Sequence, residues 1–169
     1  METKERGADH VGPTEERSVS MPGKRLVTTR VAAERTGWAY SLFEVEVGKG
    51  GGEGPHTQHR EDEYLYVLEG RFGFVVEDAA TAAGPGFQLY VPKGSLHAYR
   101  NQGDGAAGRL LVVHTPGGPQ ERFVEAAGEP AMGPTAAPGT RPSPERFALL
   151  AAEHGIEICE ATEKTERSL

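Results

Sequence analysis

Residues 50–70 read GGGEGPHTQHREDEYLYVLEG, and this stretch brings His56, Gln58 and Glu63 within eight residues of one another. A second stretch, residues 86–101, reads GFQLYVPKGSLHAYRN and supplies His97. Imidazole nitrogen and carboxylate oxygen are ligands that borderline divalent metals prefer, and two histidines with one carboxylate leave positions open for substrate or oxygen. The sequence therefore predicts a metal site made of His56, Glu63 and His97.

The two nearby histidines of the first stretch are expected to differ in role. Successive side chains of a strand point to opposite faces, so His56 and Gln58 share one face while His59 lies on the other. We therefore expect His59 to be exposed or hydrogen-bonded and not a ligand. A bulge between Gln58 and Glu63 would reverse that expectation.

Other polar residues near the two stretches have ordinary structural interpretations. Glu61 and Asp62 belong to the polar run REDE and are expected to be surface acids. His114 ends the apolar run LLVVH and could face the cavity, but it is expected to be a satisfied histidine of the core or rim. Tyr99, like the other tyrosines of the strand-like segments, is expected to pack within the β-structure.

Both stretches resemble the two motifs of the cupin family. The first motif has a glycine, five residues, H-x-H, three or four residues, a glutamate, six residues and a glycine, matched by Gly50, His56, Gln58, Glu63 and Gly70. The second has a glycine, five residues, P-x-G, two residues, a histidine, three residues and an asparagine, matched by Gly86, Pro92, Gly94, His97 and Asn101. One position departs, because Gln58 stands where the family has its second histidine. The resemblance covers roughly residues 25–118. The C-terminal tail that follows also resembles that of the small quercetin dioxygenase-like subgroup.

The resemblance implies a fold, a cofactor and an assembly. The fold is all-β, a double-stranded β-helix or jelly-roll barrel with one or two short C-terminal helices. The metal ligands are His56, Gln58, Glu63 and His97, and Glu63 can also act as the catalytic base. The cofactor is a divalent transition metal, Fe, Mn, Ni or Zn. The chain is expected to form a homodimer.

Composition agrees with a single globular domain. The 169 residues include 37% hydrophobic and 25% charged residues, and 23 Gly with 12 Pro indicate many turns. A net charge of −7 argues against nucleic acid and acidic membranes as partners. A small-molecule substrate is what the resemblance implies. The single cysteine cannot form an internal disulfide, and no run is apolar enough for a signal or a membrane span, so we expect a cytoplasmic protein.

Changes in pattern along the chain divide it into three parts. Residues 1–23 have little to bury and are expected to form a flexible N-terminal arm. Residues 24–118 contain short alternating strands separated by Gly- and Pro-rich turns, as expected of the barrel. Residues 119–169 form a helical extension, in which residues 143–154 have the pattern of a capped helix with one apolar face.

Three functions are compatible with this pattern. The first is a metal-dependent dioxygenase acting on a small enol or polyphenol-like substrate. The second is an isomerase, cyclase or hydro-lyase in which the metal polarises a carbonyl or enolate. The third is a non-catalytic barrel that binds small molecules and has lost its metal. One fold can host all three. Oxygen consumption separates the first from the second, and metal content separates both from the third.

Overall fold

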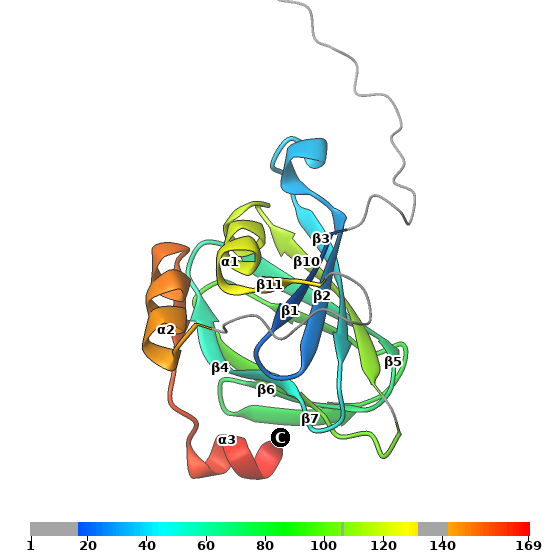
Figure 1. Ribbon diagram of the computed structural model, residues 1–169. Coiled ribbons are helices and arrows are strands. Elements are labelled where there is room, and N and C mark those ends of the chain that lie inside the picture. The colour runs from blue at the N-terminus through cyan, green and yellow to red at the C-terminus, as the bar shows by residue number, and fades with distance from the viewer. Residues whose placement is uncertain (1–16, 106, 132–141) are drawn as a thin grey trace, which may run out of the picture.

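The structure is a computed structural model that describes residues 17–105, 107–131 and 142–169. These residues form two antiparallel β-sheets with short helices at their edges (Figure 1). The larger sheet has the order β11 (Glu129–Pro130), β1 (Arg17–Met21), β2 (Arg25–Val31), β3 (Ser41–Val47), β10 (Gly108–Thr115), β5 (Asp62–Glu69) and β8 (Gln88–Val91). The smaller sheet has the order β12 (Ile156–Ile158), β4 (Gly52–Gln58), β9 (Leu96–Asn101), β6 (Phe72–Val76) and β7 (Ala79–Ala83). The helical elements are η2 (Ala33–Thr36), α1 (Pro119–Ala127), α2 (Pro144–Glu153) and α3 (Glu163–Ser168). The predicted all-β jelly-roll fold is confirmed.

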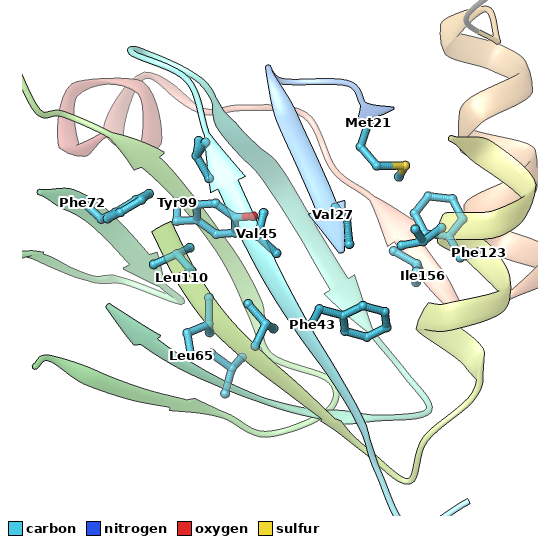
Figure 2. Packing of buried hydrophobic residues seen from close by; sticks show 14 of the residues in the cluster. Met21, Val27, Phe43, Val45, Leu65, Phe72, Tyr99, Leu110, Phe123 and Ile156 are labelled. Carbon is cyan, nitrogen blue, oxygen red and sulfur yellow. The ribbon is translucent and has the colours of Figure 1, made fainter. Parts of the chain in front are cut away.

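The core lies between the two sheets, and strand alternation explains its composition. On β5 and β10 every second side chain is buried, which places Leu65, Val67, Leu110 and Val112 inside. Burying a Val or Leu side chain of this kind stabilises the fold by about 1.5–3 kcal/mol. Figure 2 shows Leu65 and Leu110 among the apolar side chains of this core. The polar site residues described below are carried on the same inward-facing positions.

Two glycines and one asparagine hold the motif loops in place. A Cβ on Gly52 would overlap the carbonyl oxygen of Tyr99, so only glycine lets β4 approach β9 this closely. Gly94 has a left-handed backbone, and its N–H donates to the carbonyl of Gln58 at 2.7 Å. The buried Asn101 donates from Nδ2 to the carbonyl of Val47 at 2.8 Å. These bonds fix the two loops that carry the candidate ligands.

The C-terminal extension covers one end of the barrel. As predicted, Ser143 caps α2, because its side chain accepts a hydrogen bond from the N–H of Arg146 at 3.2 Å. Leu150 and Ala151 of α2 are buried, and α2 packs on β12 and α1. Figure 2 shows Phe123 of α1 beside Ile156 of β12 at this end of the core. The extension therefore completes the core.

The expected boundaries of the three parts need correction. Residues 1–16 lie outside the described residues, but residues 17–21, expected in a flexible arm, form strand β1 and pair with β2. The reason is that Val19 and Met21 alternate with polar residues, and Met21 is buried. The extension adds strands β11 and β12 to the two sheets, and it carries a third helix, α3, beyond the expected one or two. No helix in the described part of the chain is long and apolar enough to cross a membrane.

Candidate metal centre

His56 and His97 face each other across the β4–β9 pair. They are direct register partners, and their ring centroids lie 4.1 Å apart. His56 Nδ1 lies 2.9 Å from the carbonyl of Gly54, and His97 Nδ1 lies 3.0 Å from the carbonyl of Ser95. A carbonyl only accepts, so each Nδ1 carries a proton and each Nε2 is turned toward the centre. Both imidazoles are therefore oriented as metal ligands before any ion is bound.

Glu63 reaches the same point from the opposite sheet. Its Oε2 lies 2.6 Å from His97 Nε2, and both side chains are buried. Burial alone would raise the pKa of Glu63, but the facing His97 lowers it to about 2. Burial alone would lower the pKa of His97, but Glu63 raises it to about 9. Without a metal, the two residues form a buried ion pair in which a proton occupies the position that a metal would take.

The donor atoms fit a divalent metal. Ligand atoms of His56, Glu63 and His97 all lie within 4.8 Å of one another, so small side-chain shifts would bring all three to the distance of about 2.0–2.2 Å that ligands keep from one ion. His56 Nε2 is buried and has no hydrogen-bond partner among the described residues. Leaving such an atom unsatisfied costs about 1–3 kcal/mol, which a bound cation would offset. The predicted cluster is thus assembled by the fold, and ligation itself stays a prediction.

Gln58 and His114 lie beside this cluster. Gln58 Nε2 lies 3.2 Å from His114 Nε2, and Gln58 Oε1 has no partner among the described residues. His114 Nε2 lies 3.8 Å from Glu63 Oε1. Burial lowers the pKa of His114, as it does that of His56, so both rings are neutral. Gln58 therefore contacts the cluster through His114, and its role as a metal ligand stays a prediction.

His114 is buried, as expected of a core histidine, but its hydrogen bonding differs from the expectation. It was expected to be a satisfied histidine, but its Nδ1 is buried and unpartnered among the described residues. Its inward orientation could have been predicted from the sequence, because the alternation that buries Leu110 and Val112 also turns His114 inward. On the adjacent strand its register partner is Glu63.

Two other expectations have opposite outcomes. His59 is exposed and lies 3.0 Å from a carboxylate oxygen of Glu157, so the expectation that it lies outside the site is confirmed. The expectation that Glu61 is a surface acid is wrong, because its side chain is buried. Glu61 shares the inward face of Glu63 two residues away, and its Oε2 accepts from the N–H of Gln120 at 2.9 Å. Burial raises the pKa of Glu61 to about 7, against the opposing effect of that hydrogen bond.

A buried ion pair that no motif indicated forms a wall of the site. Arg25 on β2 binds Glu53 on β4 at 2.7 Å, donates from Nε to the carbonyl of Pro22 at 3.0 Å, and donates to the hydroxyl of Tyr99. Arg25, Glu53 and Tyr99 line a small internal cavity together with Glu63 and His114. Tyr99 is thus more than the packing residue expected from the sequence.

Comparison with known proteins agrees with this geometry. Residues 43–114 match the profile of the cupin domain, and comparison with curated protein sequences gave no match. The fold resembles KdgF from Halomonas sp., with 15% identity, a TM-score of 0.57, and coverage of 65% of this chain and 94% of that chain. It also resembles the polyketide cyclase RemF from Streptomyces resistomycificus, with 21% identity, a TM-score of 0.59, and coverage of 96% and 99%.

A third solved structure matches a smaller share of the chain than RemF does. Hydroxypropylphosphonic acid epoxidase from S. wedmorenis is 18% identical, with a TM-score of 0.56, and the match covers 63% of this chain and 59% of that chain. At these identities the likeness shows the fold. Residues 43–114 thus match the cupin domain in sequence, and the described residues share the fold of these solved structures.

Proposed function

We propose that this chain, which has the cupin fold, is an enzyme that holds a divalent transition metal between His56, Glu63 and His97. The observation that carries the proposal is the Nε2 atom of His56, which is buried and unpartnered among the described residues and points at a buried ion pair. Two imidazole nitrogens and one carboxylate oxygen suit Fe, Mn, Ni or Zn. A bound ion would polarise a substrate oxygen, and a redox-active ion would also support chemistry with O2.

The protein side chains have separate roles in this proposal. The carbonyls of Gly54 and Ser95 hold the two imidazoles in one tautomer, which spares the reorganisation that metal binding would otherwise require. Glu63 supplies the negative charge that partly balances the cation, and it is the carboxylate placed to take a proton from a substrate hydroxyl. Apolar side chains around the internal cavity exclude water from the reacting groups.

The first reaction class is a dioxygenase that transfers both atoms of O2 to a small enol or polyphenol-like substrate. Two histidines and one carboxylate with open positions are the donor set of non-haem iron oxygenases. The resemblance of the chain to the quercetin dioxygenase-like subgroup points the same way. Because zinc has no redox chemistry, this reaction class needs iron, manganese or nickel.

The second reaction class is an isomerase or cyclase, in which the metal acts as a Lewis acid without O2. The similarity to the polyketide cyclase RemF supports it, because that match extends over 96% of the chain, the C-terminal extension included. The same three ligands would serve both classes. The two differ in whether turnover consumes oxygen.

The test starts with the metal. Protein purified without chelator is analysed for Fe, Mn, Ni and Zn, beside Glu63→Gln as the ligand-deficient variant. We expect close to one equivalent in the wild type and much less in the variant. Oxygen uptake by the iron-loaded protein with a flavonol such as quercetin supports the dioxygenase, whereas turnover of an enolisable ketone without oxygen uptake supports the isomerase or cyclase. A wild type that takes up none of the four metals would contradict both and leave a non-catalytic binding role.

The homodimer expected from the resemblance is also part of the proposal. Light scattering at micromolar concentration should then give twice the 18.1 kDa mass of the chain. A mass near 18.1 kDa would contradict it.

A further inference from the structure

Two hollows meet at the Arg25–Glu53 ion pair. The internal cavity measures about 20 Å³ and reaches Glu63 and His114. An outer pocket of about 170 Å³ lies on the other side of the pair, is lined by Phe147 and Cys159, and reaches His56. Arg25 and Glu53 line both spaces. The ion pair is therefore the partition between the outer pocket and the internal cavity beside Glu63 and His114.

The internal cavity is too small for an organic substrate. A volume of about 10–15 Å³ holds one water molecule, so about 20 Å³ holds one water or one small ion. An organic ligand can reach the metal-facing side of Glu63 only if a wall moves. The partition is a suitable wall, because Glu53 faces the outer pocket and its carboxylate can become hydrated there when it leaves Arg25.

The charges around the partition favour an anion. The charged groups that line the two hollows are Arg25, Glu53 and Glu63. With a divalent ion bound and the imidazoles neutral, these groups leave a net positive charge in a region of low dielectric constant, where an unbalanced charge is costly. When Glu53 leaves, Arg25 keeps its charge and loses its partner. A ligand oxygen with negative charge would take the place of the Glu53 carboxylate.

A donor for that ligand is already in place. The hydroxyl of Tyr99 accepts from Arg25, so its own O–H can donate to a ligand oxygen. Figure 2 shows this hydroxyl oxygen directed into the barrel beside Val45. The polar side chains of His114 and Gln120 also line the cavity. The rest of its wall is apolar and would contact an apolar body; it is formed by Val27, Phe43, Val45, Val112 and Val124.

We infer that the centre takes a compact organic anion, such as a carboxylate with an apolar body, which enters through the outer pocket and displaces Glu53 from Arg25. Arg25 then binds the charged oxygen and Tyr99 donates to it. The inference deepens the proposed function and rests on it for the metal, whereas the exchange of Glu53 for the ligand depends on Arg25 alone. Arg25 and Tyr99 are thus positioning and specificity residues.

The test uses 2-aminobenzoate, a fluorescent aromatic carboxylate, with zinc-loaded and with metal-free protein. Glu53→Gln removes the competing carboxylate and should raise the affinity about tenfold in both forms. Glu157→Gln is the matched control, because Glu157 is exposed on β12 and lines neither hollow, and it should bind as the wild type does. An affinity in Glu53→Gln equal to or below that of wild type, in folded protein, overturns the inference.

A double variant is included because a single substitution leaves one buried charge unpaired and can destabilise the fold. Replacing both partners, Arg25→Met with Glu53→Leu, leaves no unpaired buried charge and should fold, because apolar replacement of a buried ion pair is often neutral or stabilising. We expect this variant to lose 2-aminobenzoate binding. Binding as tight as in wild type would overturn the role of Arg25.

The entry route is tested separately. Alkylation of Cys159 with N-ethylmaleimide fills the outer pocket and should slow association of 2-aminobenzoate, while Cys159→Ser treated in the same way should not change. An unchanged rate in the alkylated wild type rules out this pocket as the entrance. If neither the wild type nor the variants bind zinc, the proposed function fails. The 2-aminobenzoate affinities of the metal-free wild type and variants still decide the inference about Arg25.

Discussion

Glu53 and His56 both face the interior of the barrel, although side chains three residues apart on a regular strand point to opposite faces. The cause is a β-bulge. Glu53 pairs with Tyr99 and His56 pairs with His97, so three steps along β4 oppose two steps along β9. Pro55, which has no N–H to give to the ladder, lies within the bulge. The extra residue turns Glu53 inward and places the Arg25–Glu53 pair beside the candidate metal centre.

The cluster of His56, Glu63 and His97 predicts which acid matters for metal binding. Glu63→Gln should weaken the affinity for zinc by about a hundredfold or more, because it removes a direct ligand and its charge. Asp62→Asn is the matched control, since the Asp62 carboxylate accepts from the N–H of Lys93 at 2.9 Å and lies outside the cluster. Calorimetric titration measures both. Equal losses in the two variants would show that the ligand assignment is wrong.

The burial of one face of α2 predicts a contribution to stability. Leu150→Ala should lower the free energy of unfolding by about 2–5 kcal/mol, because it leaves a cavity beneath the helix. Leu149→Ala, at a side chain that is 60% exposed, should change it by less than about 0.5 kcal/mol. Urea denaturation followed by circular dichroism compares them. Similar destabilisation by both variants would mean that α2 does not pack on the core through the face that carries Leu150.

The ion pair of His97 and Glu63 predicts that the metal-free protein loses stability as the pH rises. Folded His97 keeps its proton up to a pKa of about 9, whereas in the unfolded chain it loses it near 6.5. Unfolding therefore releases a proton between these values, and stability that is fully present below pH 6.5 is lost by pH 9, on the order of 3 kcal/mol. The lowered pKa of Glu63 has the same cause, the ion pair with His97. Its contribution is therefore not added to the loss of stability given for His97.

Urea midpoints between pH 6.5 and 9, with chelator and with saturating zinc, measure this loss. Zinc should abolish it, because the metal takes the place of the proton between the two side chains. His59→Gln is the control and should keep the loss, since His59 lies outside the site and is paired with Glu157. A stability that is flat over this range in metal-free wild type would contradict the ion pair.

The motif residues could be predicted from the sequence because their positions depend on local rules. Strand alternation and motif spacing place His56 inward and His59 outward, and glycines mark the turns. The capped helix at Ser143 follows from its first four residues for the same reason. Features of this kind can be predicted from the residues that are adjacent in the sequence.

The residues that complete the site could not be predicted in this way, because they depend on the meeting of distant segments. Arg25 and Glu53 are far apart in the sequence, and the bulge that turns Glu53 inward is not visible in the pattern. Glu61 was expected at the surface from its polar neighbours, but α1 covers it, with the N–H of Gln120 bonded to its carboxylate. Polar composition alone did not reveal that a helix from the extension closes over this strand.

Gln58, the one departure from the motif, predicts a gain of metal affinity on reversal. Gln58 shares the inner face with His56. Its Oε1, which has no partner in the part of the chain that the structure describes, is a neutral oxygen and a weaker ligand for zinc or iron than an imidazole nitrogen. Gln58→His should therefore raise the affinity for zinc by about tenfold or more, the equivalent of at least 1.4 kcal/mol. It should also remove the contact with His114, so the fold is checked by circular dichroism.

The reverse exchange on the outer face is the control for this variant. His59→Gln removes an imidazole that is exposed and bonded to Glu157, and zinc affinity should stay as in wild type. Calorimetric titration of the wild type, Gln58→His and His59→Gln separates the outcomes. Binding by Gln58→His alone would mean that the natural protein is metal-free and that its role is non-catalytic. Binding by neither the wild type nor Gln58→His would contradict the site itself, because three oriented donors and a fourth imidazole on the same face would then fail to hold a metal.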